Sequence, residues 1–237
     1  YTIHVDPDDW VEPEMLRELY DKAMECDADM VICDYISEYK WGGGKKNCRQ
    51  KPKACNTQII LRQLMFQQLH GSCWNKLIRR ACYSRYNVRF PNNIIRWEDL
   101  YVVCSLLMYP IKCVYLPKAF YHYDQIINNN SIVRKTTKQG LHSQILFIEH
   151  FKKIGFSKEL LYPAKRATKE LAYCSRLLSK AQVVSLFFEI NEAYINEKTD
   201  SLNFVHKGLT ALICGNNFKS TLYKMLYILW LLKKKWK

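Results

Sequence analysis

Three aspartates crowd into four positions near the start of this chain, at Asp6, Asp8 and Asp9. The five residues before them alternate apolar and polar side chains, which predicts a short strand. Carboxylates this close repel one another, so a fold holds them together where a positive charge neutralises them. A divalent cation is a natural partner, because Mg²⁺ favours one or two carboxylates together with phosphate oxygens. At the C-terminal end of a strand, such acids would lie where open α/β sheets bind ligands.

The same residues also have a purely structural explanation, which the sequence alone leaves open. Asp and Pro are common in turns, and this segment could be a turn that caps the following helix. A second acidic pair, Glu98 and Asp99, has the same two explanations, because acidic side chains are favoured at a helix N-terminus. We predict a helix over residues 98–109, with this pair in its first turn.

Periodic apolar side chains predict the other elements. We expect helices over residues 13–25, 57–69, 141–154, 158–179 and 182–195, and strands over residues 29–36 and 113–123, the second broken at Pro117. The glycine-rich segment 41–46 is either a solvated hairpin tip or a basic loop that covers phosphates, since glycine lets a backbone approach a ligand closely. The hairpin tip is favoured, because the strand–loop–helix setting of a phosphate loop is missing.

Several short segments follow one another in a characteristic order along the first part of the chain. They are Val5 to Leu16, Asp29 to Tyr35, Asn75 to Arg80, Arg89-Phe90-Pro91, Trp97-Glu98-Asp99-Leu100 and Tyr121-His122-Tyr123, which leads to Ser131-Ile132-Val133-Arg134. With these segments in this order, the chain resembles the C-terminal part of an inverting family 2 glycosyltransferase of the bacterial polysaccharide type, over roughly residues 1–135. A lone Asp-x-Asp is a weak signal, whereas the ordered set is specific.

The resemblance implies an α/β fold with a partial GT-A, Rossmann-like core. Residues 1–135 would form the metal and acceptor side of the GT-A domain, and residues 136–237 a helical appendage. The family's upstream half, which carries the nucleotide base and ribose pocket, has no counterpart in the sequence. We therefore expect a fragment of a larger enzyme, with little or no transferase activity by itself.

The activity implied is the transfer of a sugar from a nucleotide-sugar donor, UDP-linked, to a glycan or lipid-linked acceptor in cell-surface polysaccharide synthesis. Asp8 would be the direct metal ligand, and Asp6 would face the nucleotide ribose or a metal-bound water. A bound Mg²⁺ or Mn²⁺ would act as a Lewis acid on the diphosphate. Asp99 would be the general base, with Glu98 beside it contacting the acceptor or orienting the loop. Asp9 would orient its loop or cap the next helix.

Five further residues take roles from the same resemblance. Trp97 would stack on the acceptor sugar, and Asn75 and Lys76 would line the acceptor or diphosphate side. Ser131 and Arg134 would contact the diphosphate. These roles complete the set of side chains that the resemblance places around the donor and the acceptor.

The chain departs from the family's pattern after the Tyr-x-Tyr strand. The family often places a basic residue there that meets the diphosphate, whereas residues 124–130 contain none before Arg134. His122 could ligate a metal, but a lone histidine is more often structural, and we favour that role.

The net charge of +14 is concentrated in the second part of the chain. Residues 101–237 carry 21 Lys and Arg against 8 Asp and Glu, which predicts an anionic partner, either a membrane surface or a polyanion. Within residues 218–237, the apolar run Met225–Leu232 is much shorter than the about 20 residues that span a bilayer. Its aromatic residues and flanking lysines suit an interfacial helix on an anionic leaflet. A core-packing helix with a solvated basic tail fits equally well.

Two other function classes stay open, a nucleic-acid-binding basic protein and a non-catalytic, membrane-associated scaffold. The basic residues form no recognised nucleic-acid motif, so we expect no nucleic-acid partner. The ten cysteines contain no Cys-x-x-Cys pair and predict reduced core thiols. We accordingly expect a cytoplasmic protein, peripheral at the inner face of the cell membrane. A truncated α/β core would expose apolar surface, which predicts a homo-oligomer.

Overall fold

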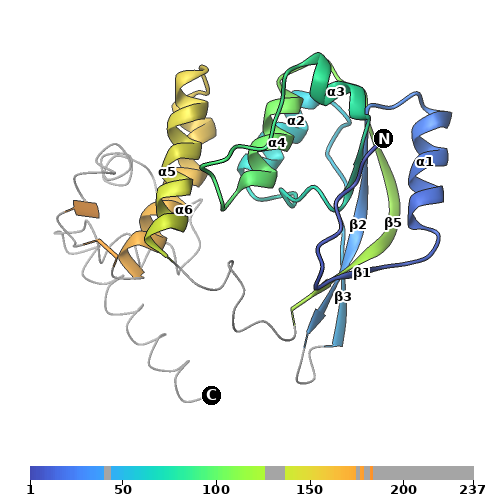
Figure 1. The fold of residues 1–237 in the computed structure, drawn as a ribbon, viewed down its shortest axis with the longest axis horizontal. Coiled ribbons are helices and arrows are strands. Elements are labelled where there is room, and N and C mark those ends of the chain that lie inside the picture. The colour runs from blue at the N-terminus through green and yellow to red at the C-terminus, as the bar shows by residue number, and fades with distance from the viewer. Residues whose placement is uncertain (40–43, 126–136, 175–176, 179–181, 184–237) are drawn as a thin grey trace.

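The computed structural model describes residues 1–39, 44–125, 137–174, 177–178 and 182–183 (Figure 1). Its strands are β1 (Trp10–Val11), β2 (Met30–Tyr39), β3 (Gly44–Cys48), β4 (Lys76–Ile78) and β5 (Cys113–Asp124). Its helices are α1 (Met15–Glu25), α2 (Thr57–Met65), α3 (Arg80–Arg85), α4 (Glu98–Leu107), α5 (Lys138–Lys153) and α6 (Lys158–Cys174). The expected α/β fold is confirmed. Within the described ranges, no helix combines the length and the apolar character that crossing a bilayer requires.

The central strand of the single mixed sheet is β2. It pairs in parallel with β5 along one edge, and its other edge pairs antiparallel first with β4 and then with β3. The short strand β1 extends the sheet beyond β5. The run Met-Val-Ile-Cys at the start of β2 is fully buried, as expected for a strand covered by other elements on both faces.

Successive side chains of β2 point into two different hydrophobic clusters, because a strand alternates its faces. Met30 and Ile32 belong to the cluster formed with α2 and α4. Val31 and Cys33 belong to the cluster formed with Met15, Leu19 and Ala23 of α1. The sheet therefore lies between α1 on one face and the α2–α4 pair on the other (Figure 1).

Helices α5 and α6 pack on the far side of α2 and α4 (Figure 1). Phe147, Ile148 and Phe151 of α5 are buried in the same cluster as the apolar side chains of α2 and α4, and so are Leu161 and Ala164 of α6. Residues 138–174 thus share a core with the preceding part of the chain.

The structure corrects two expectations about the strands. The predicted strand before the aspartates is reduced to one isolated bridge between Thr2 and Ile78, and β1 follows the aspartates instead of preceding them. The strand expected to break at Pro117 continues through it as β5. The pairing of β5 with β2 passes from Leu116–Cys33 to Ala119–Asp34, so Pro117 lies in a bulge where its missing N–H breaks no ladder bond.

The expected helices differ from the observed ones mainly at their ends. The helix expected from residue 13 begins at Met15, and the helix expected to residue 69 ends at Met65. Of segment 41–46, residues 44–46 lie in β3, which pairs antiparallel with β2 with Tyr39 opposite Gly44. Residues 41–43, most of the helix expected over residues 182–195, and all of segment 218–237 lie outside the described residues.

The described cysteines are free thiols, and five of them are buried. This agrees with the predicted role of cysteine as a small core side chain. Burial raises the pKa of the Cys33 and Cys104 thiols to about 12, so both stay protonated and unreactive near neutral pH.

Candidate active site

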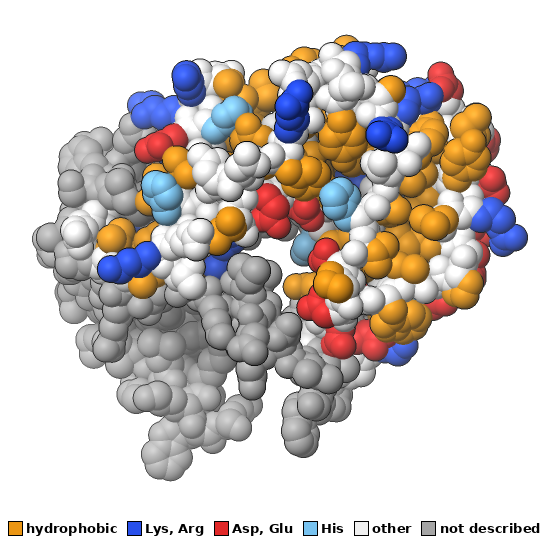
Figure 2. Space-filling view, in the orientation of Figure 1, with side chains coloured by type: hydrophobic (Ala, Val, Ile, Leu, Met, Phe, Trp, Pro, Cys, Tyr) orange, Lys and Arg blue, Asp and Glu red, His pale blue; other side chains and the backbone are white. Residues whose placement is uncertain are grey.

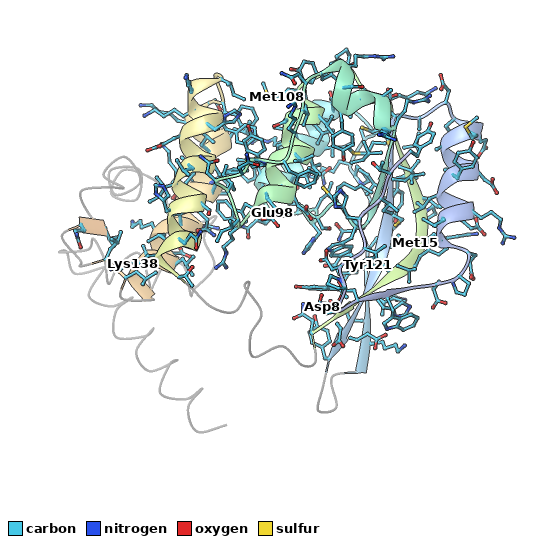
Figure 3. All side chains as sticks on the ribbon, viewed as in Figure 1. Asp8, Met15, Glu98, Met108, Tyr121 and Lys138 are labelled. Carbon is cyan, nitrogen blue, oxygen red and sulfur yellow. The ribbon has the colours of Figure 1, made fainter. Side chains whose placement is uncertain are left out.

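A cavity of about 890 Å³ opens between the aspartate segment, the loop after α2 and the beginning of α4. Four carboxylates line it: Asp6 and Asp8 from the first segment, and Glu98 and Asp99 from α4. Figure 2 shows acidic side chains gathered at the hollow near the middle of the view, and Figure 3 labels Asp8 and Glu98 on their separate elements. The fold therefore brings together the two acidic pairs that the sequence singled out.

Tyr121 of β5 holds the aspartate segment in place. The backbone N–H of Asp9 donates to the carbonyl oxygen of Asp6 at 3.1 Å and closes a turn. The N–H of Asp6 donates to the Tyr121 hydroxyl at 3.1 Å, and that hydroxyl donates to Oδ2 of Asp9 at 2.6 Å. The other oxygen of Asp9 accepts the N–H of Asp124 at 2.9 Å. Asp9 thus fixes the turn to β5, and Asp6 and Asp8 line the cavity.

This arrangement decides between the two expected roles of Asp9. Asp9 orients its loop and does not cap the next helix, since the N-cap position of α1 is Glu14. Its two carboxylate oxygens are both occupied by partners on β5. Asp9 is also absent from the cavity wall.

The carboxylates of the cavity interact electrostatically across the fold. The pKa of Asp6 is raised, mainly by burial and then by the negative charges of Asp9, Asp99 and Asp8. The pKa of Glu98 is also raised by burial, with smaller effects of Asp99 and Asp6 in the same direction. A positive charge placed among these groups would relieve this repulsion.

A strained residue sets the beginning of α4. Trp97 precedes the helix with φ of 70°, a left-handed conformation that is uncommon outside glycine and that clusters at functional sites. The turn places Glu98 and Asp99 at the cavity, and Oδ2 of Asp99 accepts the backbone N–H of Cys73 at 2.9 Å. The Trp97 ring also lines the cavity and packs edge-on against Phe147 of α5 at 5.3 Å between centroids.

Asn75 and Lys76 lie beneath the cavity, not in its wall. Both side chains are buried, and neither lines the cavity. Nζ of Lys76 donates to the carbonyl oxygens of His70 and Ser72 at 2.8 and 2.6 Å, and to Oδ1 of Asn75 at 2.7 Å. Burial lowers the pKa of Lys76 to about 8. The two residues therefore hold the loop that forms the cavity floor, and their expected contact with a ligand is not what the structure shows.

Aromatic side chains form one wall of the cavity. Tyr35, His70, Trp74 and Tyr123 line it, and the Trp74 ring stacks on Tyr121 and Tyr123 at centroid distances of 4.3 and 5.5 Å. Burial lowers the pKa of His70 to about 4, so this ring is neutral near pH 7. Sequence reasoning missed this wall. The alternation Tyr121-His122-Tyr123 already placed the two tyrosines on one face of a strand, but nothing in the sequence placed Tyr35 or His70 beside them.

His122 is a structural residue, as favoured from the sequence. It is 2% exposed, and its Nδ1 and Nε2 lie 2.6 Å from Glu38 and 2.9 Å from Glu12. Its ring stacks on Trp10 at 3.3 Å between centroids. It does not line the cavity, so the alternative role as a metal ligand there is wrong.

The described residues contain no group of three or more His, Cys, Asp or Glu side chains placed to hold a metal ion. The pair Asp6 and Asp8 supplies two carboxylates, which is what Mg²⁺ uses where phosphate and water provide its other oxygens. Ser131 and Arg134 lie outside the described residues.

The chain is similar in sequence to a glycosyltransferase. It is 24% identical over 155 residues to the glycosyltransferase GlyA of Streptococcus pneumoniae serotype 4, a match that covers 61% of this chain and 21% of GlyA. The chain thus spans about a fifth of the length of this relative. No family model matches it.

Solved structures of S. aureus TarS resemble the chain more distantly. The structure of TarS residues 1–349 is 13% identical, with a TM-score of 0.46, and the match covers 90% of this chain and 55% of TarS 1–349. The same region of TarS in complex with UDP-GlcNAc is 14% identical, with a TM-score of 0.47 and coverages of 90% and 57%.

Proposed function

We propose that this chain is the metal and acceptor side of an inverting glycosyltransferase of the GT-A type. The enzyme would transfer a sugar from a UDP-linked donor to a saccharide or lipid-linked acceptor in cell-surface polysaccharide synthesis. The observation that carries the proposal is the meeting of four carboxylates, from two distant segments, in one cavity. The similarity to GlyA supports sugar transfer as the activity.

The residues at the cavity suit a divalent cation. Asp8 is the proposed direct ligand of Mg²⁺ or Mn²⁺, and Asp6 faces the donor ribose or a metal-bound water. Both supply carboxylate oxygens, which such hard cations prefer. When bound, the cation supplies Lewis-acid activation of the diphosphate leaving group. The cation would also stabilise the ionised form of Asp6, which the neighbouring negative charges disfavour.

Asp99 is the proposed general base. The N–H of Cys73 holds its Oδ2 at 2.9 Å, which fixes the direction of the carboxylate and leaves Oδ1 to accept the proton of the acceptor hydroxyl. Glu98 lies beside it in the first turn of α4 and is proposed to contact the acceptor.

The aromatic wall, together with Trp97, is proposed to hold the acceptor sugar. Trp97 and Tyr123 offer flat apolar surfaces to the C–H groups of a sugar ring, and neutral His70 offers a polar edge. A cavity of about 890 Å³ lies in the range of typical small-molecule sites and exceeds what one sugar ring fills.

The test of this proposal is the Asp99→Asn variant in a form of the protein that includes a nucleotide-binding half. General-base catalysis contributes about 10²- to 10⁴-fold, so we expect kcat to fall by that factor with little change in the KM for the donor. Asp21→Asn, at an exposed position on α1, is the matched control and should retain full activity. An unchanged kcat for Asp99→Asn would refute the role of Asp99.

A further inference from the structure

One basic side chain lines the same cavity as the acids. Of the described residues that line it, Arg96 is the one that carries a Lys or Arg side chain. Its guanidinium nitrogen Nη1 is buried and has no hydrogen-bond partner in the described part of the structure. An arginine elsewhere in the chain shows the contrast, because Arg79 forms ion pairs with Asp27 and Asp29.

A guanidinium N–H that is buried without a partner is costly, because it loses water and gains no hydrogen bond in return. Burial accordingly lowers the pKa of Arg96, and no neighbouring carboxylate offsets this effect. The half-buried Arg96 side chain therefore keeps one desolvated N–H group at the wall of the cavity. A negatively charged group of a ligand would satisfy it.

The surroundings of Arg96 also favour an anion. Cδ of Arg96 lies 3.6 Å from the position that a Cβ would take at Gly140, in the first turn of α5. Arg96 thus runs along the N-terminal end of this helix, which carries the positive end of the helix dipole. The next two residues along the chain, Trp97 and Glu98, also line the cavity.

We propose that Arg96 binds a phosphate group of the ligand that occupies this cavity. The planar guanidinium can donate two parallel N–H bonds to phosphate oxygens, a geometry that lysine cannot reproduce. This inference rests on the proposed function and deepens it, because Arg96 and the carboxylate-bound cation would together neutralise one phosphorylated ligand. The phosphate belongs either to the diphosphate of the donor or to that of a lipid-linked acceptor.

The test compares Arg96→Met and Arg96→Lys with Arg89→Met, a charge-matched control at an exposed position. Two probes are titrated in the presence of Mn²⁺ into the form of the protein that includes a nucleotide-binding half, UDP for the donor and farnesyl diphosphate for the acceptor. Loss of charge-assisted hydrogen bonds predicts a weakening of about 10- to 100-fold for Arg96→Met, a smaller one for Arg96→Lys, and none for Arg89→Met.

The probe that is weakened identifies the source of the phosphate. Weakened binding of UDP assigns Arg96 to the donor, and weakened binding of farnesyl diphosphate assigns it to the acceptor. If the wild type binds a probe and Arg96→Met binds both as tightly as the wild type does, the inference is overturned while the proposed function stands. If the wild type binds neither probe, both are overturned.

Thermal unfolding separates ligand binding from a structural role. Since Nη1 has no partner without ligand, Arg96→Met should melt at the same temperature as the wild type or above it. UDP with Mn²⁺ should then raise the melting temperature of the wild type more than that of the variant. A lower melting temperature for both Arg96 variants, with unchanged ligand binding, would show that Arg96 is structural.

Discussion

At the scale of the residue, the main feature is a set of carboxylates that the fold holds in unfavourable proximity. Asp6 and Glu98 both have raised pKa values, for which burial is the main cause and neighbouring acids a further one. Structural acids usually acquire hydrogen bonds that favour their charge, as Asp9 does from Tyr121 and the N–H of Asp124. Burial raises the pKa of Asp9 as well, so Asp9 differs from Asp6 in these hydrogen-bond partners and not in the direction of its pKa shift.

The raised pKa values predict how stability depends on pH. A folded protein with raised carboxyl pKa values binds more protons than the unfolded chain, whose carboxyl pKa values are about 4. Stability should therefore fall as the pH rises above about 4 and these groups ionise. Asp6→Asn should melt at a higher temperature than the wild type at pH 7 without metal, and this gain should shrink near pH 4. Asp21→Asn is the control, and an equal gain for it would contradict the explanation.

At the scale of the element, the beginning of α4 is positioned by close packing against the loop after α2. A Cβ at Gly71 would lie 2.8 Å from Cδ1 and 3.1 Å from Cβ of Leu100, which is in the first turn of α4. Glycine at position 71 thus lets the floor of the cavity approach the helix that carries Glu98 and Asp99 this closely.

Gly71→Ala should destabilise the protein by about 1–3 kcal/mol, the usual cost of overpacking, and should displace α4 from the loop. Leu100→Ala removes Cδ1 but keeps Cβ, so the double variant should recover part of this loss. Urea denaturation of the two single variants and the double variant measures the coupling. Purely additive changes in the free energy of unfolding would mean that positions 71 and 100 do not interact.

The sequence predicted many of these helices and strands, and each wrong or missing prediction has a physical cause. Alternating and helical periodicity located β2, β5, α2 and α4, because buried faces impose those periods. It also singled out all four carboxylates of the cavity. It misplaced Asn75 and Lys76, because spacing along the chain does not tell whether a loop turns a polar side chain outward or inward. It missed Arg96, whose importance appears only when its lack of a partner is seen.

At the scale of the whole molecule, α5 and α6 share a hydrophobic core with α2 and α4. Phe147 and Phe151 are fully buried among side chains of α2 and α4, and Ala164 of α6 lines the cavity. The sequence pattern changes near residue 135, but the segments before and after that point contribute side chains to one hydrophobic cluster.

This shared core predicts that the first part of the chain depends on α5. Phe147→Ala should lower the free energy of unfolding by about 3–5 kcal/mol, the cost of removing a buried aromatic side chain. Ile154→Ala, at an exposed position at the end of α5, should change it by less than about 0.5 kcal/mol. Urea denaturation followed by circular dichroism measures both changes. A small effect of Phe147→Ala would indicate that the helices are an independent unit.

The central claim is that the carboxylates of the cavity bind a divalent cation together with a nucleoside diphosphate. Calorimetric titration of UDP, with and without Mn²⁺, tests it most directly, with the wild type, Asp8→Asn and Asp21→Asn each prepared in the form of the protein that includes a nucleotide-binding half. Asp8 is exposed, so its substitution leaves the core unchanged. We predict that UDP binds the wild type and Asp21→Asn only when Mn²⁺ is present, and that Asp8→Asn abolishes this binding. Binding that needs neither Mn²⁺ nor Asp8, or no binding by the folded wild type, would contradict the account.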